Sequence, residues 1–272
     1  MRFWRDDEKK FKQLINILRD PMTKEKKMEI HTHDFVEIEY VLFGAGVQII
    51  NNKEYKVCRG DLIFLKKGDC HTYYTENRIE IINVVFYYSV FEEMCNILHT
   101  YTPEINFPTI THFAGKDMIC IEDLILNAEK EFLNEKRGYY HILKSTLTTL
   151  LIYLWRNTSE PQYKANYKLT LILEYIDNNY SSVNIHDVAN HFGYSYDYFS
   201  SMFKKSFGIT FVNYINKKRM NQAVELLITT DMTVDAICET VGFKDKKHFY
   251  NIFKRHIGST PGELRKNNST TS

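Results

Sequence analysis

The sequence predicts a two-domain protein with an N-terminal β-barrel and helix pair, followed by a C-terminal all-α domain of two helix-turn-helix units. Three observations support this prediction. Short β-rich segments fill residues 29–86, apolar residues then follow a helical period over 117–156, and one pattern occurs twice in the C-terminal part. A length of 272 residues agrees with two domains of ordinary size.

The C-terminal pattern repeats after about fifty residues. The copies share aromatic, basic and glycine positions, which pair as Phe199 with Phe249, Phe203 with Phe253, Lys204 with Lys254 and Gly208 with Gly258. Each copy has the pattern of a helix, a Gly-containing turn and a second helix, which is the plan of a DNA-binding helix-turn-helix. Residues 210–227 have the pattern of the helix that connects the two copies.

The second helix of each copy is predicted to bury one face and expose the other. Ser195 and Asp245 stand at the N-cap positions of these two helices. The predicted inward positions are Phe199, Met202 and Phe203 in the first copy, and Phe249, Ile252 and Phe253 in the second. The outward positions, which are the candidates for reading bases, are Asp197, Ser200 and Ser201, then Lys246, Lys247, Tyr250 and Asn251.

The second copy is expected to be the stronger reader of bases. Lys246 or Lys247 can donate hydrogen bonds to guanine, and Asn251 can make the bidentate contact with adenine. The first copy offers serine and aspartate, which are weaker or conditional partners. Two unlike readers on one connecting helix predict an asymmetric DNA site.

The N-terminal half has the pattern of short strands followed by a helix pair. The expected strands are 36–43, 47–50, 55–57, 61–65 and 79–86, separated by glycine and asparagine. Gly138 separates the two expected helices, whose apolar face should pack on the barrel, on a second subunit, or on both.

The sequence also indicates the boundaries of the two domains and of the linker between them. We expect a sensing and dimerisation domain at 1–157, a linker at 158–165, a DNA-binding domain at 166–266 and a tail at 267–272. Residues 9–21 place Phe11, Leu14, Ile15 and Leu18 at helical spacing. A plain amphipathic packing helix is the favoured interpretation of that stripe, and an arm that repacks on ligand binding is the alternative.

Charge and cysteine usage restrict the class of protein. The net charge is +1, but residues 168–266 carry 13 basic against 10 acidic side chains, which agrees with DNA contact through local patches. The five cysteines form no Cys-x-x-Cys motif, so reduced thiols in a cytoplasmic protein are expected. The chain shows neither a signal peptide nor a membrane-spanning stretch.

The C-terminal hundred residues resemble the AraC/XylS family of bacterial transcription regulators. The matching positions are Tyr194-Ser195, Phe203-Lys204, Gly208, residues 211–220, Ala223, Leu226-Leu227, Val241-Gly242-Phe243, Phe249, Phe253-Lys254, Gly258, Thr260-Pro261 and Leu264-Arg265. Cys238 departs from the usual alanine but is small enough to keep the helix crossing. The resemblance implies two helix-turn-helix units on double-stranded DNA, a homodimer, and activation through RNA polymerase. Lys204, Arg219 and Lys254 are then expected to contact phosphates or to support the fold.

The N-terminal half contains a histidine pattern that resembles the metal motifs of cupins. His31-x-His33-x-x-x-Glu37 resembles the first motif and His71 belongs to the second, in which Lys66 replaces the usual proline. These residue types suit a divalent transition metal. The favoured interpretation is instead a small-molecule effector, of which a sugar is one candidate, held by polar anchors in the barrel. The anchors would be His31, His33, Glu37, His71 and Tyr73.

The predicted function is therefore a cytoplasmic, effector-responsive transcription regulator, more an activator than a repressor, and neither an enzyme nor a cofactor-binding protein. The first alternative is a metal-dependent cupin enzyme fused to a DNA-binding module. The second is a regulator without an effector, controlled by its abundance alone. Metal analysis, turnover assays and a ligand-stabilisation screen distinguish these three.

Overall fold

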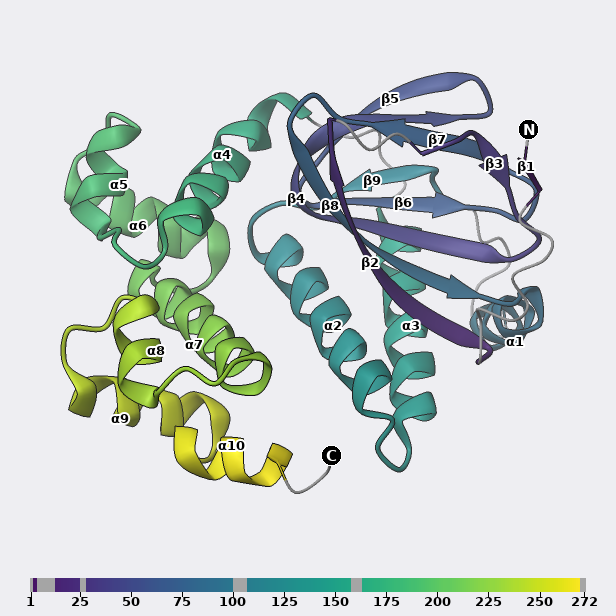
Figure 1. Cartoon of the computed structure of the whole chain (residues 1–272). Coiled ribbons are helices and arrows are strands. Elements are labelled where there is room, and N and C mark those ends of the chain that lie inside the picture. Colours follow the sequence, from purple (N-terminus) through teal and green to yellow (C-terminus); the bar gives the residue numbers. More distant parts are fainter. Residues whose placement is uncertain (1, 4–12, 25–27, 100–106, 158–162, 270–272) are drawn as a thin grey trace. The chain divides into compact units, whose positions relative to one another are not determined.

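The computed structural model describes residues 2–3, 13–24, 28–99, 107–157 and 163–269 (Figure 1). The chain forms two compact units, Met1–Thr170 and Leu171–Ser272. The predicted linker begins at residues 158–162, which lie outside the described ranges. Helix α4 (Tyr163–Asn179) begins within that predicted linker.

One sheet with nine described strands dominates the first unit. The strands are β1 (Arg2–Phe3), β2 (Ile15–Thr23), β3 (His31–Thr32), β4 (Val36–Ile50), β5 (Lys53–Cys58), β6 (Asp61–Leu65), β7 (Cys70–Tyr74), β8 (Arg78–Phe86) and β9 (Ile110–His112). The main path runs β1-β3-β7-β4-β6-β9, with β5 on β4 and β2 on β8. Its ends do not pair with each other within the described residues. The predicted barrel is therefore an open sheet rather than a closed one.

Strand β4 merges two of the strands that the sequence predicted separately. Its first part pairs with β6 and β8, and its last part with β5 and β7. The pairing with β8 shifts register between Val41 and Phe43, and Gly44 follows with φ +79°. A Cβ on Gly44 would lie 2.0 Å from the Arg78 carbonyl oxygen, so only glycine fits this close approach. Gly44 therefore lies within a continuous strand rather than between two strands.

The amphipathic helix predicted at 9–21 is wrong for the described part of that segment. Residues 15–23 form β2, which pairs antiparallel with β8 along its whole length. Ile15 and Ile17 are buried, whereas Leu14 and Leu18 are exposed. A spacing of three and four residues over so short a stretch fits both periods, and the free edge of β8 selects the strand.

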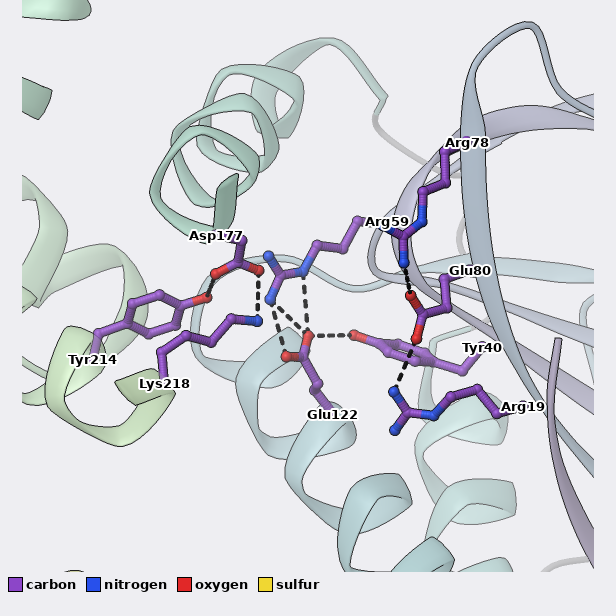
Figure 2. Close-up of polar contacts among 9 residues, drawn as sticks. All are labelled: Arg19, Tyr40, Arg59, Arg78, Glu80, Glu122, Asp177, Tyr214 and Lys218. Carbon is purple, nitrogen blue, oxygen red and sulfur yellow. Dashed lines mark hydrogen bonds and ion pairs between the residues drawn. The ribbon is translucent and has the colours of Figure 1, made fainter. Parts of the chain in front are cut away.

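Three described helices accompany the sheet: α1 (Tyr88–His99), α2 (Gly115–Asn134) and α3 (Tyr139–Arg156). The predicted pair over 117–156 is confirmed as α2 and α3, and Gly138 separates them with φ +89°. Figure 2 shows how α2 is tied to the sheet, with Glu122 between Arg59 and Tyr40. Arg19 of β2 adds an ion pair to Glu129 of α2 and another to Glu80 of β8.

The second unit confirms the two predicted helix-turn-helix motifs. Its helices after α4 are α5 (Ile185–His191), α6 (Tyr196–Phe207), α7 (Phe211–Thr229), α8 (Val234–Thr240), α9 (Lys246–Ile257) and α10 (Pro261–Ser269). The first motif is α5–α6, the second is α8–α9, and α7 connects them as predicted. Among the described residues, no helix has the length and apolarity needed to span a membrane.

Candidate DNA-reading helices and effector site

Helix α6 buries an aromatic stripe and exposes a polar face, as the sequence predicts. The Ser195 hydroxyl accepts a hydrogen bond from the backbone N–H of Tyr198 and caps the helix. Phe199, Phe203 and Phe207 are buried against the rest of the unit, whereas Met202, also predicted to point inward, is half-buried. The predicted base-reading positions lie away from that stripe: Asp197 and Ser201 are exposed and Ser200 is half-buried.

Helix α9 repeats this arrangement with different outward residues. Asp245 caps it by accepting hydrogen bonds from the backbone N–H groups of Lys247 and His248. Its inward residues Phe249, Ile252 and Phe253 are buried. The predicted reading residues are all exposed: Lys246, Lys247, Tyr250 and Asn251.

The two lysines at the start of α9 differ in their surroundings. The Lys246 ammonium lies 2.6 Å from the Asp235 carboxylate of α8, and this hydrogen bond raises the pKa of the lysine. Lys247 makes no ion pair with any described residue. Of the two predicted guanine donors, only Lys246 would have to give up a carboxylate before it could meet a base.

The three predicted phosphate contacts also differ. Lys204 and Lys254 are exposed on α6 and α9. Arg219 of α7 instead donates two hydrogen bonds within the protein, to the carbonyls of Tyr180 at 2.8 Å and Ser181 at 3.2 Å. These contacts favour the supporting role among the two that the resemblance implies.

Two exposed tyrosines on α6 were not among the predicted reading residues. Tyr196 is 45% exposed and Tyr198 is 57% exposed, beside Asp197 at the start of the helix. Large aromatic side chains left in solvent at this end of α6 offer apolar contacts to thymine methyl groups. The sequence signal was a pair of aromatic residues off the buried stripe.

The N-terminal histidine pattern forms a buried cluster on the inner side of the sheet. His33 Nε2 lies 3.0 Å from a carboxylate oxygen of Glu37, and His71 Nε2 lies 3.7 Å from the same oxygen. The ligand atoms of these three residues all lie within 4.8 Å of one another. His31 stands beside them, with its ring centroid 4.3 Å from that of His71. We call His31, His33, Glu37 and His71 the histidine cluster.

The second ring nitrogens of these histidines are held by neighbouring groups. Nδ1 of His31 bonds the Glu29 carbonyl at 2.9 Å, and Nδ1 of His33 bonds the Phe35 carbonyl at 3.0 Å. A donor at Nδ1 leaves a lone pair at Nε2, which is the form that a metal requires. Burial lowers the pKa of His71 to about 4, which keeps that ring neutral. His33, Glu37 and His71 therefore fit a divalent transition metal.

Three more buried polar residues adjoin the cluster, and sequence reasoning missed them. Gln48 donates to Glu39 at 2.8 Å, and both side chains are fully buried. One oxygen each of Glu39, Gln48 and Asn83 has no hydrogen-bond partner among the described residues. Burial and the neighbouring Glu37 charge raise the pKa of Glu39. The sequence signal was the Glu37-x-Glu39 alternation on a strand, which puts both carboxyls on one face.

Tyr73 lies in the apolar core next to this polar interior. Its hydroxyl donates to the Asp20 carboxylate at 2.6 Å, and burial with this contact raises its pKa. The remaining core around it is aliphatic. The structure thus brings four of the five predicted effector anchors into the cluster and leaves Tyr73 bonded to β2.

A separate cavity of about 550 Å³ lies between β6 and α1. Its walls are aromatic, from Phe64, Phe91 and Phe107, with Lys66 and Lys67 among the lining side chains. None of the five predicted effector residues lines it. The histidine cluster has the stronger chemical argument, because Nε2 of His33 and of His71 also lacks a hydrogen-bond partner among the described residues. Buried polar atoms of this kind are costly unless a ligand meets them.

Comparison with known proteins matches both halves of the chain. Residues 19–111 match the AraC-like ligand binding domain and residues 188–267 match the helix-turn-helix domain. The HTH-type transcriptional activator RhaS of Yersinia pseudotuberculosis is 28% identical over 240 residues, which cover 86% of this chain and 88% of RhaS.

Among solved structures, similarity is found both to an isolated C-terminal domain and to a structure that aligns with most of this chain. The C-terminal domain of the response regulator yesN of Fusobacterium nucleatum is 36% identical, covers 37% of this chain and 99% of its own, and has a TM-score of 0.36. An apo ToxT variant of Vibrio cholerae is 12% identical, covers 93% and 97% of the two chains, and has a TM-score of 0.40. The family patterns and the RhaS relative thus span both described units. The chain belongs to the AraC family of transcription regulators and combines an AraC-like ligand-binding domain with a helix-turn-helix DNA-binding domain.

Proposed function

We propose that this protein activates transcription by binding an asymmetric DNA site with α6 and α9, under the control of an effector in the histidine cluster. The DNA-binding part of this proposal rests on the arrangement that α6 and α9 share. Each is capped by a side chain, is anchored by buried phenylalanines and presents different polar residues at equivalent outward positions. Activation is supported by the name of the RhaS relative.

The residues proposed to read bases are Asp197, Ser200 and Ser201 of α6, and Lys246, Lys247, Tyr250 and Asn251 of α9. Lys204 and Lys254 are proposed to contact phosphates. A homodimer is proposed through α2 and α3, where Leu133 and Ile142 remain exposed on the single chain. RNA polymerase is the proposed partner of the DNA-bound dimer.

Replacing Asn251 by alanine is expected to weaken binding at one base pair by about 1–3 kcal/mol, because that base loses a bidentate partner. Replacing Lys204 by alanine is expected to weaken specific and scrambled DNA alike and to lower the salt dependence of binding. Titration of the full chain with a selected site and with single-base variants measures both effects. Equal losses on specific and scrambled DNA for both variants would remove the base-reading assignment.

The effector is proposed to be a small ligand rich in hydrogen-bond donors, and a sugar meets that description. The support is the set of buried oxygens on Glu39, Gln48 and Asn83 that accept no hydrogen bond from the described residues, the Glu39 oxygen lying 3.6 Å from Nδ1 of His71. A divalent transition metal is the second candidate, supported by the spacing of His33, Glu37 and His71. Such an ion would be held by two imidazole nitrogens and a carboxylate, and would sense rather than catalyse.

Ligand binding at the cluster is expected to raise the unfolding temperature of the full chain. At 100 times the dissociation constant the gain is about 2.7 kcal/mol. The measurement is a thermal-shift screen of metal-free protein with neutral sugars and, separately, with Zn²⁺. His33→Ala should abolish the shift, and His141→Ala, an exposed histidine on α3, should retain it.

Two other results of the thermal-shift screen would change this assignment of the effector site. A shift that survives His33→Ala but is lost in Phe91→Ala would place the ligand in the cavity beside α1. Absence of any shift would favour a regulator controlled by its abundance.

A further inference from the structure

The second helix-turn-helix motif directly touches the turn between α4 and α5, in addition to its connection through α7. The contact joins Gly242, in the turn between α8 and α9, to Ser181, in the turn that follows α4. Gly242 has φ +91°, and a Cβ placed on it would lie 1.8 Å from the Ser181 carbonyl oxygen. No other residue fits this approach without moving one of the two turns.

Arg219 fastens the same point from the middle of α7. Its guanidinium donates hydrogen bonds to the carbonyls of Tyr180 and Ser181. The central guanidinium carbon, Cζ, lies 5.5 Å from the centre of the Phe243 ring. Phe243 belongs to the core of the second motif, where it contacts Phe249 of α9. One side chain therefore holds the turn before α5 and the turn before α9 together.

A second connection fixes α7 on α4. The Asp177 carboxylate of α4 accepts a hydrogen bond from the Tyr214 hydroxyl at 3.2 Å and pairs with the Lys218 ammonium at 2.8 Å, and both partners lie on α7 (Figure 2). With the Arg219 clamp, three side chains of α7 hold this helix to α4 and to the turn that follows α4. The connecting helix is thus fixed along its side as well as at its ends.

We infer that Arg219, with the Gly242–Ser181 contact, is a positioning element that fixes α6 and α9 relative to each other, so that they accept only one spacing of their half-sites. The inference rests on the proposed function of α6 and α9 as DNA readers. One added base pair rotates the second half-site by about 35° and moves it by about 3.4 Å. A clamped pair of helices cannot follow that change, and one half-site loses its contacts.

The substitution Arg219→Lys distinguishes this positioning role from a contact with a DNA phosphate. Lysine keeps the positive charge, so it retains attraction to a phosphate. It lacks the planar fork that bonds two carbonyls at once, so it releases the clamp. Arg219→Lys therefore separates the two roles that the sequence left open for this residue.

The test compares the selected DNA site with versions in which one base pair is inserted or deleted between the half-sites. Full-length wild-type protein is expected to lose at least about tenfold in affinity on either change, because contacts to one half-site are broken. In Arg219→Lys the loss should shrink to about threefold or less. Lys204→Ala is the matched control, and its affinity should fall by the same factor at every spacing.

Each outcome decides one question. Equal spacing penalties in wild type and Arg219→Lys, or tolerance of both spacings by wild type, would overturn the clamp. An Arg219→Lys variant that keeps the wild-type affinity at every spacing would fit a phosphate contact and would likewise overturn the clamp, since lysine keeps the positive charge. Gly242→Ala should reproduce the relaxed spacing, and a helicity measurement identifies a variant that is merely unfolded. Failure of wild type to require two half-sites would overturn the proposed function itself.

Discussion

Replacing Arg59 by methionine is expected to lower the free energy of unfolding of the first unit by about 3–5 kcal/mol. The Arg59 guanidinium is 1% exposed and contacts both carboxylate oxygens of Glu122, each at 3.0 Å. Removal of the arginine leaves the Glu122 carboxylate in a largely buried position with only the Tyr40 hydroxyl among these partners (Figure 2). An uncompensated buried charge is among the costliest defects that one substitution produces.

The double variant Arg59→Met with Glu122→Leu is the matched control. It removes both charges, and apolar replacement of a buried ion pair is neutral or stabilising in comparable cases. At least half of the lost stability should therefore return. Trp155 lies on α3 of the first unit and residues 171–272 contain no tryptophan, so denaturant titration followed by tryptophan fluorescence reports no unfolding of the second unit directly. A double variant as unstable as the single one would show that packing, rather than charge, dominates this site.

Replacing Phe249 by alanine is expected to destabilise the second unit by about 3–5 kcal/mol and to abolish specific DNA binding. Phe249 is fully buried on the inner face of α9, among Phe243, Phe253 and Met220. Its loss leaves a cavity at the point where the reading helix is anchored. The helical signal in circular dichroism should show an earlier transition, while the midpoint from tryptophan fluorescence stays unchanged.

Tyr250→Ala provides the neighbouring control. Tyr250 is 39% exposed, so its removal should change stability by less than about 0.5 kcal/mol while weakening specific DNA binding. The pair therefore separates anchoring from reading on two adjacent residues. Equal stability losses in the two variants would contradict the assignment of the inner and outer faces of α9.

The C-terminal half was predictable because its determinants are local. The repeat gave the register, Ser195 and Asp245 marked the helix starts, and the phenylalanine spacing gave the buried stripes. The Arg219 clamp was not predictable, since it depends on a turn about 40 residues away in the sequence coming to α7. The choice between phosphate contact and support therefore required the structure.

The N-terminal half was less predictable because the pairing between distant strands decides which segments become strands. Residues 15–23 became a strand through their partner β8, which periodicity in so short a segment cannot reveal. The histidine motif located His33, Glu37 and His71 correctly as one cluster. Glu39, Gln48 and Asn83 were missed, because their burial depends on the bend of β4 and on the pairing of β8.

The most direct test of the central claim is selection of binding sites from randomised DNA by the full-length protein, followed by quantitative footprinting. The account predicts two unlike half-motifs about 10–10.5 base pairs apart, with more information in the half that Asn251→Ala and Lys247→Ala alter. The half-motif nearer to α6 should respond instead to Ser201→Ala. Enrichment of no sequence, or of one motif that none of these three substitutions changes, would contradict the claim that α6 and α9 read DNA as two unlike helices.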